Sequence, residues 1–116
     1  MNINDFLQKY RRVKYGMNVT RPRVKCADGY TVSVQAGYGL YSMPRKDAYF
    51  YENVELGYPS EMDAELEPYA DGTICAFVPV NVVDAVLKKH GGIVGADFSN
   101  DMGRVWKDVD SDAKAD

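Results

Sequence analysis

The sequence predicts an α+β fold: an antiparallel sheet of four to five strands built from hairpins, covered on one face by two to three short helices. Residues 21–35 alternate apolar and polar side chains on both sides of an Asp-Gly turn, which is a strong hairpin signal. Residues 4–13 and 80–90 instead place apolar side chains at helical spacing. Hairpin strands mixed with short helices are typical of a sheet that is covered on one face.

The 116-residue length fits one domain, which we place at residues 1–109, followed by a frayed acidic tail at residues 110–116. The charge is divided unevenly along the chain. Residues 1–46 contain nine Lys and Arg against two acids, whereas residues 47–116 contain five against fifteen. Such an asymmetry favours a surface that binds a charged partner or an anionic ligand.

Composition also restricts the cellular setting. No stretch approaches the roughly 20 apolar residues of a membrane span, and the first residues lack the apolar segment of a secretion signal. We therefore expect a cytoplasmic protein. In that compartment Cys26 and Cys75, each inside an apolar run, are expected to be free cysteines of the core.

The first half of the chain contains one expected helix and the clearest hairpin. Asn4 is expected to cap a helix that Gly16 ends, with one apolar face formed by Phe6, Leu7, Tyr10 and Val13. The hairpin strands span residues 21–26 and 30–35. Its polar face is expected to carry Arg21, Arg23, Lys25, Thr31, Ser33 and Gln35.

The second half alternates strands with short helices. Strands are expected at residues 49–56 and 73–78, with a short strand at Ile93-Val94. Ser60 and Asp63 outline a capped helical turn over residues 61–66, which Pro68 ends. Pro79 begins the next helix and Gly91-Gly92 ends it. A last helical stripe runs from Phe98 to Val109.

The segment between Gly37 and Tyr51 is the best candidate for a binding surface. Its tyrosines Tyr38, Tyr41, Tyr49 and Tyr51 could stack on bases, and Arg45 and Lys46 could hold phosphate. Arg21, Arg23 and Lys25 could extend this surface along the hairpin. Alternatively, half of the rings cover the core, because tyrosine is often half-buried.

Trp106 is a further candidate with two interpretations. It either anchors a tail helix on the sheet, or it inserts into a neighbouring subunit or a target, as tryptophans at binding hot spots do.

No residue pattern indicates catalysis, a metal or a cofactor. His90, the lone histidine, is expected to serve the last turn of its helix, since no spacing supplies an orienting carboxylate and a nucleophile. Gly37-Tyr38-Gly39 lacks the third glycine of a dinucleotide loop. The acids between Glu52 and Asp71 follow no EF-hand order, so a solvated face is favoured over a metal site. A minority interpretation is that these carboxylates imitate the phosphates of a nucleic acid.

Three segments resemble parts of small proteins encoded by bacteriophages and prophages. They are Arg21–Ala36, Val54–Glu61 and Val78–Ile93, in this order, and the ends of the chain lie outside the resemblance. The resemblance implies an accessory phage role in the host cytoplasm, and counter-defence is a frequent role of such proteins.

Three functions remain open from the sequence. The first is an anti-CRISPR-like stoichiometric inhibitor of a bacterial immune protein. The second is sequestration of a nucleotide immune signal by Tyr38, Tyr41, Arg45 and Lys46, in a pocket that could lie between subunits of an oligomer. The third is binding of DNA or RNA by the basic hairpin, which should weaken steeply with salt. An enzyme is less favoured, because no nucleophile–base pair is recognisable.

Overall fold

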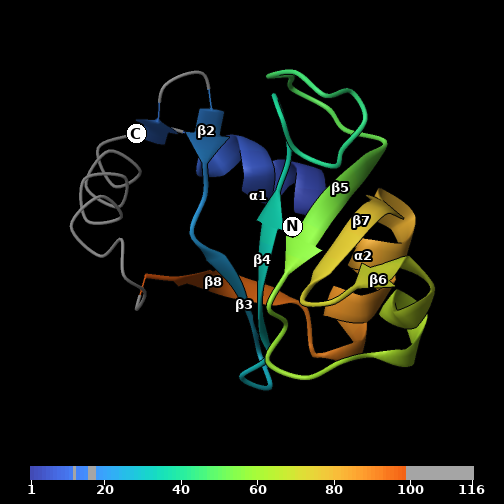
Figure 1. Ribbon diagram of the computed structural model, residues 1–116. Helices are drawn as coiled ribbons and strands as arrows, with labels where there is room; N and C mark the ends of the chain where they lie inside the picture. Colours follow the sequence, from blue (N-terminus) through green and yellow to red (C-terminus); the bar gives the residue numbers. More distant parts are fainter. Residues whose placement is uncertain (12, 16–17, 99–116) are drawn as a thin grey trace.

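The described residues form a six-stranded antiparallel sheet with the strand order β6-β7-β5-β4-β3-β8 (Figure 1). This computed structural model describes residues 1–11, 13–15 and 18–98. The strands of the sheet are β3 (Arg23–Cys26), β4 (Thr31–Gln35), β5 (Asn53–Gly57), β6 (Ala70–Asp71), β7 (Ile74–Pro79) and β8 (Ile93–Asp97). A separate pair of strands consists of β1 (Val13–Tyr15) and β2 (Asn18–Thr20).

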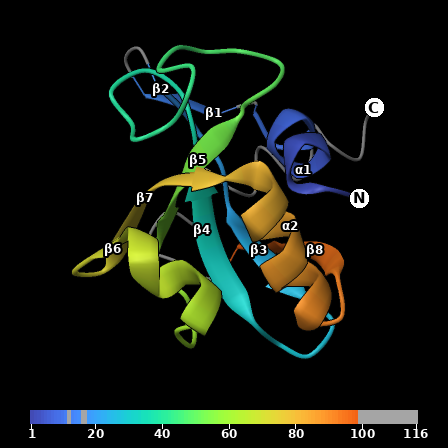
Figure 2. The same ribbon diagram turned by 90° about the vertical axis from the view of Figure 1, so that its right-hand side faces the viewer.

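Two α-helices, α1 (Ile3–Lys9) and α2 (Val80–Lys89), cover one face of the sheet (Figures 1 and 2). A 3-10 helix, η1 (Ala64–Tyr69), packs beside α2 and β7. The core between these layers is contributed by both helices and the four central strands: Ile3, Phe6, Leu7, Val24, Cys26, Val32, Val34, Val54, Leu56, Cys75, Val78, Val83, Val86 and Leu87. The expected α+β class and the helix-covered face are confirmed, with six strands in place of four or five.

The hairpin and the second helix form where their local signals place them. In β3 and β4 every second residue is buried, and Gly29 adopts a φ of 96° in the turn that joins them. Pro79 precedes α2, and Gly91 follows its end with a φ of 94°. A Cβ on Gly91 would lie 2.7 Å from the Cβ of Ala27, so this glycine lets the end of α2 approach the hairpin turn.

Four expectations about element ends are wrong. Helix α1 ends at Lys9, well before Gly16, and Val13, expected on the apolar face of this helix, lies in β1. Asn2, not Asn4, caps α1: its side chain accepts from the Asp5 backbone N–H while its own N–H donates to the Asp5 carboxylate. The expected helical turn begins later, at Ala64, and Pro68 lies inside it. The third strand begins at Asn53, because residues 49–52 belong to the preceding loop.

The last expected helix lies outside the described residues from its second residue onward, as does the tail at residues 110–116. Among the described residues, no helix has the length and apolar character that a bilayer crossing needs.

Candidate functional site

The connection between β4 and β5 lies at one end of the sheet (Figure 1). It exposes a group of large apolar side chains. We call this group the aromatic loop surface; it consists of Tyr38, Tyr41, Met43, Tyr49, Phe50 and, from the adjacent strand β7, Phe77. The exposed fraction reaches 78% for Tyr49 and 62% for Phe50. A folded protein gains nothing from leaving such rings in water, so their exposure favours a binding role.

Hydrogen bonds inside the loop fix its shape. The buried Tyr51 donates its hydroxyl to the Lys46 carbonyl and accepts from the Ala48 N–H, both at 2.9 Å. The buried Ser42 hydroxyl accepts from the Gly37 N–H at 3.0 Å and donates to the Pro44 carbonyl. These bonds, each between residues two to five positions apart, hold the turns of the loop through two interior side chains.

Helix α1 holds the same loop from outside. The Asn4 amide pairs with the Tyr51 backbone, donating to its carbonyl at 3.1 Å and accepting from its N–H at 2.9 Å. The Gln8 amide donates to the Ala48 carbonyl at 3.1 Å. The exposed rings therefore stand on a loop that is ordered before any partner arrives.

Phe77 reaches the loop because β7 carries a bulge there. The register between β5 and β7 shifts between Val54 and Leu56, and the Phe77 N–H donates to the Tyr41 carbonyl at 3.1 Å. Phe77 adopts a φ of 52°, a left-handed conformation that costs a residue with a side chain about 1–2 kcal/mol. Its ring lies 5.7 Å from that of Tyr41. The bulge thus directs an exposed phenyl ring beside an exposed phenol at an energetic cost.

Cations accompany the exposed rings. The Arg45 guanidinium lies 5.6 Å from the Tyr41 ring and its Nε donates to the Leu40 carbonyl. Arg11 lies 4.9 Å from the Tyr49 ring and forms an ion pair with Asp47. This pair joins the basic and the acidic part of the chain. Tyrosine beside guanidinium provides both a stacking surface and a positive charge.

Two candidates from the sequence lie in the interior, and their expected exposure is wrong. Tyr51 is fully buried because it ties the loop together. Arg21 is 1% exposed: its guanidinium donates to the Leu7 and Ala36 carbonyls at 2.8 and 3.1 Å, joining α1 to the end of β4. Burial lowers the pKa of Arg21.

The other expected site residues are exposed on the loop, placed on the hairpin or outside the described residues. Tyr38, Tyr41, Arg45, Lys46 and Tyr49 are exposed on the loop, as expected. On the hairpin, Lys25 is exposed, whereas the half-buried Arg23 donates to the Thr31 hydroxyl and to the Tyr58 carbonyl. Trp106 lies outside the described residues.

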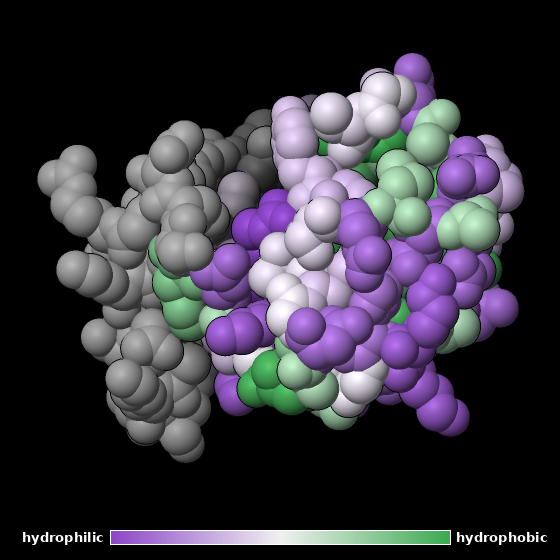
Figure 3. All heavy atoms as spheres, turned by 90° about the horizontal axis from the view of Figure 1, so that it is seen from below, coloured by the Kyte–Doolittle hydropathy of each residue, from purple (hydrophilic) through white to green (hydrophobic). Residues whose placement is uncertain are grey.

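A cluster around His90 lies at the opposite end of the sheet, where α2 meets the hairpin turn (Figure 1). The expectation that the His90 side chain serves the last turn of its helix is wrong: only the backbone N–H bonds the last-turn carbonyls, whereas the buried imidazole contacts two carboxylates that the sequence did not indicate. Its Nδ1 lies 2.6 Å from Asp28 Oδ2, and its Nε2 lies 3.0 Å from Asp63 Oδ1. This face of the molecule is largely hydrophilic (Figure 3).

The charges of this cluster support one another. Burial disfavours the charged imidazolium, but hydrogen bonds to Asp28 and Asp63 outweigh it and raise the pKa of His90. Lys89 Nζ lies 2.6 Å from Asp63 Oδ1 and 3.0 Å from Glu65 Oε1. Although burial acts against it, bonds to Lys89 and His90 lower the pKa of Asp63. Sequence reasoning missed this cluster, since Asp28 and His90 are 62 residues apart.

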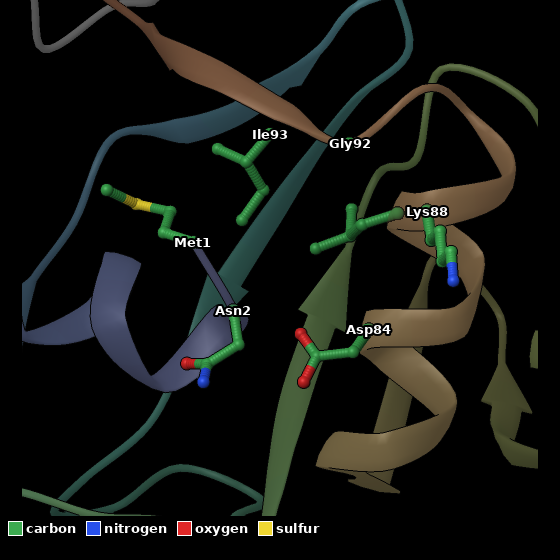
Figure 4. Close-up of a pocket in the computed structure, with 7 residues that line it drawn as sticks. Met1, Asn2, Asp84, Lys88, Gly92 and Ile93 are labelled. Atoms are coloured by element: carbon green, nitrogen blue, oxygen red, sulfur yellow. The ribbon is translucent and has the colours of Figure 1, made fainter.

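A pocket of about 370 Å³ lies between the start of α1, α2 and the start of β8 (Figure 4). Asp84 points from α2 toward the start of α1, where its Oδ1 accepts from the Ile3 N–H at 2.7 Å. Burial raises the pKa of this carboxyl. Asp84 thereby joins α2 to the start of α1.

No family model, curated protein or solved structure matches this chain. The functional argument therefore depends on the geometry of the two ends of the sheet.

Proposed function

We propose that this chain works by stoichiometric binding and docks its aromatic loop surface onto a protein partner. The observation that carries this proposal is the combination of exposed rings with a loop that is hydrogen-bonded from within and from α1. Aromatic side chains are the usual anchors of binding hot spots. A preformed loop loses little conformational entropy on docking, so more of the contact energy remains as affinity.

The partner we propose is a bacterial immune protein, which the chain would inhibit in the manner of an anti-CRISPR protein. This choice rests on the resemblance of three segments to phage-encoded proteins, and the surface chemistry is compatible with it. Arg45 and Lys46 are exposed among the tyrosines and would favour acidic groups around the edge of the contact.

Sequestration of a nucleotide signal is the second candidate, favoured by the arrangement of Tyr41, Phe77 and Arg45. A base could stack on the two neighbouring rings while the guanidinium neutralises a phosphate. Nucleic-acid binding by the hairpin is less favoured, because Arg21 is committed to the interior and cannot reach a phosphate backbone.

The test expresses the chain in bacterial strains that each carry one defined immune system, and measures phage plating. Wild type should restore plating in at least one strain, and the purified immune protein should bind the chain at a 1:1 ratio per protomer. Phe50→Ser and Tyr49→Ser should each weaken that binding by about 30-fold, as loss of a hot-spot residue does.

Met62→Ser is the matched control, since Met62 is an exposed apolar side chain outside the loop surface. It should bind like wild type. Plating restored equally by wild type and both loop variants would contradict the proposed surface. If plating is restored in no strain and one nucleotide raises the melting temperature of the chain, nucleotide sequestration is favoured over inhibition of an immune protein.

A further inference from the structure

We propose that Asp28, Glu61 and His90 form a binding site for a divalent transition-metal ion, for which Zn²⁺ is the best match. The three residues come from the β3–β4 turn, the segment after β5 and the end of α2. They lie at the end of the sheet opposite the aromatic loop surface (Figure 1). The inference is therefore independent of the docking surface.

The ligand atoms already lie close together. One nitrogen or oxygen from each of the three residues falls within 4.8 Å of the others. His90 Nδ1 is 2.6 Å from Asp28 Oδ2 and 3.6 Å from Glu61 Oε1. Around a tetrahedral Zn²⁺ with bonds of about 2.0–2.1 Å, ligand atoms are roughly 3.3 Å apart. The two carboxylates are 48% and 65% exposed, so they can make the small adjustment required.

The surroundings of His90 resemble those of a metal-ligating histidine. Such a histidine usually donates its second ring N–H to a carboxylate, which fixes the tautomer and the ring orientation. Asp63 occupies that position 3.0 Å from Nε2 and is itself paired with Lys89. The Tyr30 ring stacks on the imidazole and holds its plane. Nδ1 is thereby directed between Asp28 and Glu61.

The neighbouring groups leave suitable atoms free for a cation. Asp28 uses Oδ1 to accept from the Tyr30 N–H at 2.9 Å, so its Oδ2 remains for His90 or an ion. Four carboxylates, those of Asp28, Glu61, Asp63 and Glu65, surround the cluster, against the charges of Lys89 and His90. Negative charge is therefore in excess even when the imidazole is protonated.

The ligand set selects the kind of ion. Imidazole nitrogen suits Zn²⁺ and other transition metals, whereas Ca²⁺ and Mg²⁺ prefer sites built from oxygen alone. The competing occupant of Nδ1 is a proton, because the imidazolium can donate to Asp28. Binding of the metal therefore releases this proton to solvent and leaves Nε2–H bonded to Asp63. A fourth coordination position remains for water or a partner side chain.

The test titrates Zn²⁺ into the full chain without a polyhistidine tag, following heat, melting temperature and the ¹⁵N shifts of the imidazole. Because His90 is the only histidine, its Nδ1 signal reports on the site directly. Zn²⁺ should shift that signal and raise the melting temperature by about 10 °C at 100 times its dissociation constant. Mg²⁺ and Ca²⁺ at the same concentration should do neither.

Glu61→Gln and Asp28→Asn should each lower Zn²⁺ affinity at least 10-fold. Glu65→Gln is the control, since Glu65 is a similarly exposed carboxylate that bonds Lys89 outside the three ligands. It should bind Zn²⁺ like wild type. An unchanged Nδ1 signal at millimolar Zn²⁺, or equal affinity of Glu61→Gln and wild type, would overturn the assignment.

Discussion

The imidazole of His90 lies flat against the ring of Tyr30, with ring centroids 3.9 Å apart and planes 6° from parallel. The stacking brings the turn of the first hairpin and the end of α2 together at one point. The imidazole, which can carry a positive charge, thus lies against the π face of Tyr30. Its two nitrogens face the carboxylates of Asp28 and Asp63 on opposite sides of the ring.

The first prediction concerns pH in the metal-free chain, held in a chelator. The bonds to Asp28 and Asp63 raise the pKa of His90 above its unfolded value, despite burial and with Glu61 and Lys89 nearby. A group with a raised folded pKa contributes stability that is fully present below its unfolded pKa, about 6.5 for histidine. That stability is lost as pH rises through the folded pKa. The free energy of unfolding in urea should therefore fall from pH 6 toward pH 8.

His90→Gln is the control for this effect, because it keeps a polar side chain but cannot titrate. Its unfolding free energy should be nearly constant over the same range. Measurements should stay below pH 8, since the buried Cys26, whose pKa burial raises to about 11, adds its own loss at higher pH. An equal decline in both proteins would assign the effect to another group.

The second prediction separates two neighbouring tyrosines of the loop. Tyr51→Phe removes the hydroxyl that serves the Lys46 carbonyl and the Ala48 N–H, and should lower the free energy of unfolding by about 1–3 kcal/mol. Tyr49→Phe should have almost no effect on stability, because the Tyr49 ring is exposed. Urea titrations of both variants make this comparison, and equal stabilities would contradict the anchoring role of Tyr51.

The third prediction concerns Arg21. Arg21→Met keeps most of the buried volume but leaves the Leu7 and Ala36 carbonyls without their donor. We expect the free energy of unfolding to fall by about 2–4 kcal/mol for these two groups. Lys25→Met, on the exposed part of the hairpin, should change stability by less than about 0.5 kcal/mol. A small effect at Arg21 would show that water readily replaces the guanidinium.

Elements with strong local signals could be predicted from the sequence, whereas interior polar contacts could not. The β3–β4 hairpin follows from period-2 alternation on both sides of an Asp-Gly turn. Helix α2 follows from the proline at its start and the glycines after its end. The signals for each element lie within about 15 residues. Of the two edge strands, β6 was not expected and β8 only as a short strand at Ile93-Val94, because their residues are half-buried or exposed throughout and show no clear alternation.

The residues whose exposure was wrongly predicted are buried for the same physical reason. Arg21 precedes β3 and Tyr51 precedes β5, so neither obeys the alternation of the strand that follows it. Each is buried because it satisfies backbone groups brought close by tertiary packing. The His90 cluster shows the same limit: Asp63 lies 27 residues before His90 and Asp28 lies 62 before it, and no spacing rule joins them.

The fourth prediction tests whether the strained Phe77 serves binding. A residue with a side chain is costly at a φ of 52°, whereas glycine adopts this conformation freely. Phe77→Gly should therefore keep the free energy of unfolding at or above the wild-type value, even though the contact with the Tyr41 ring is lost.

Affinity for the immune protein identified by phage plating should fall by about 10-fold or more in Phe77→Gly, since the variant removes an aromatic anchor. Phe77→Leu is the matched variant: it retains the strained backbone and an apolar side chain, so it should be less stable than Phe77→Gly but bind more tightly. Opposite orders for stability and affinity are expected only if the bulge in β7 is maintained for contact with a partner. If Phe77→Gly lowers both quantities together, the ring is a structural part of the loop, and the docking surface is confined to residues 38–50.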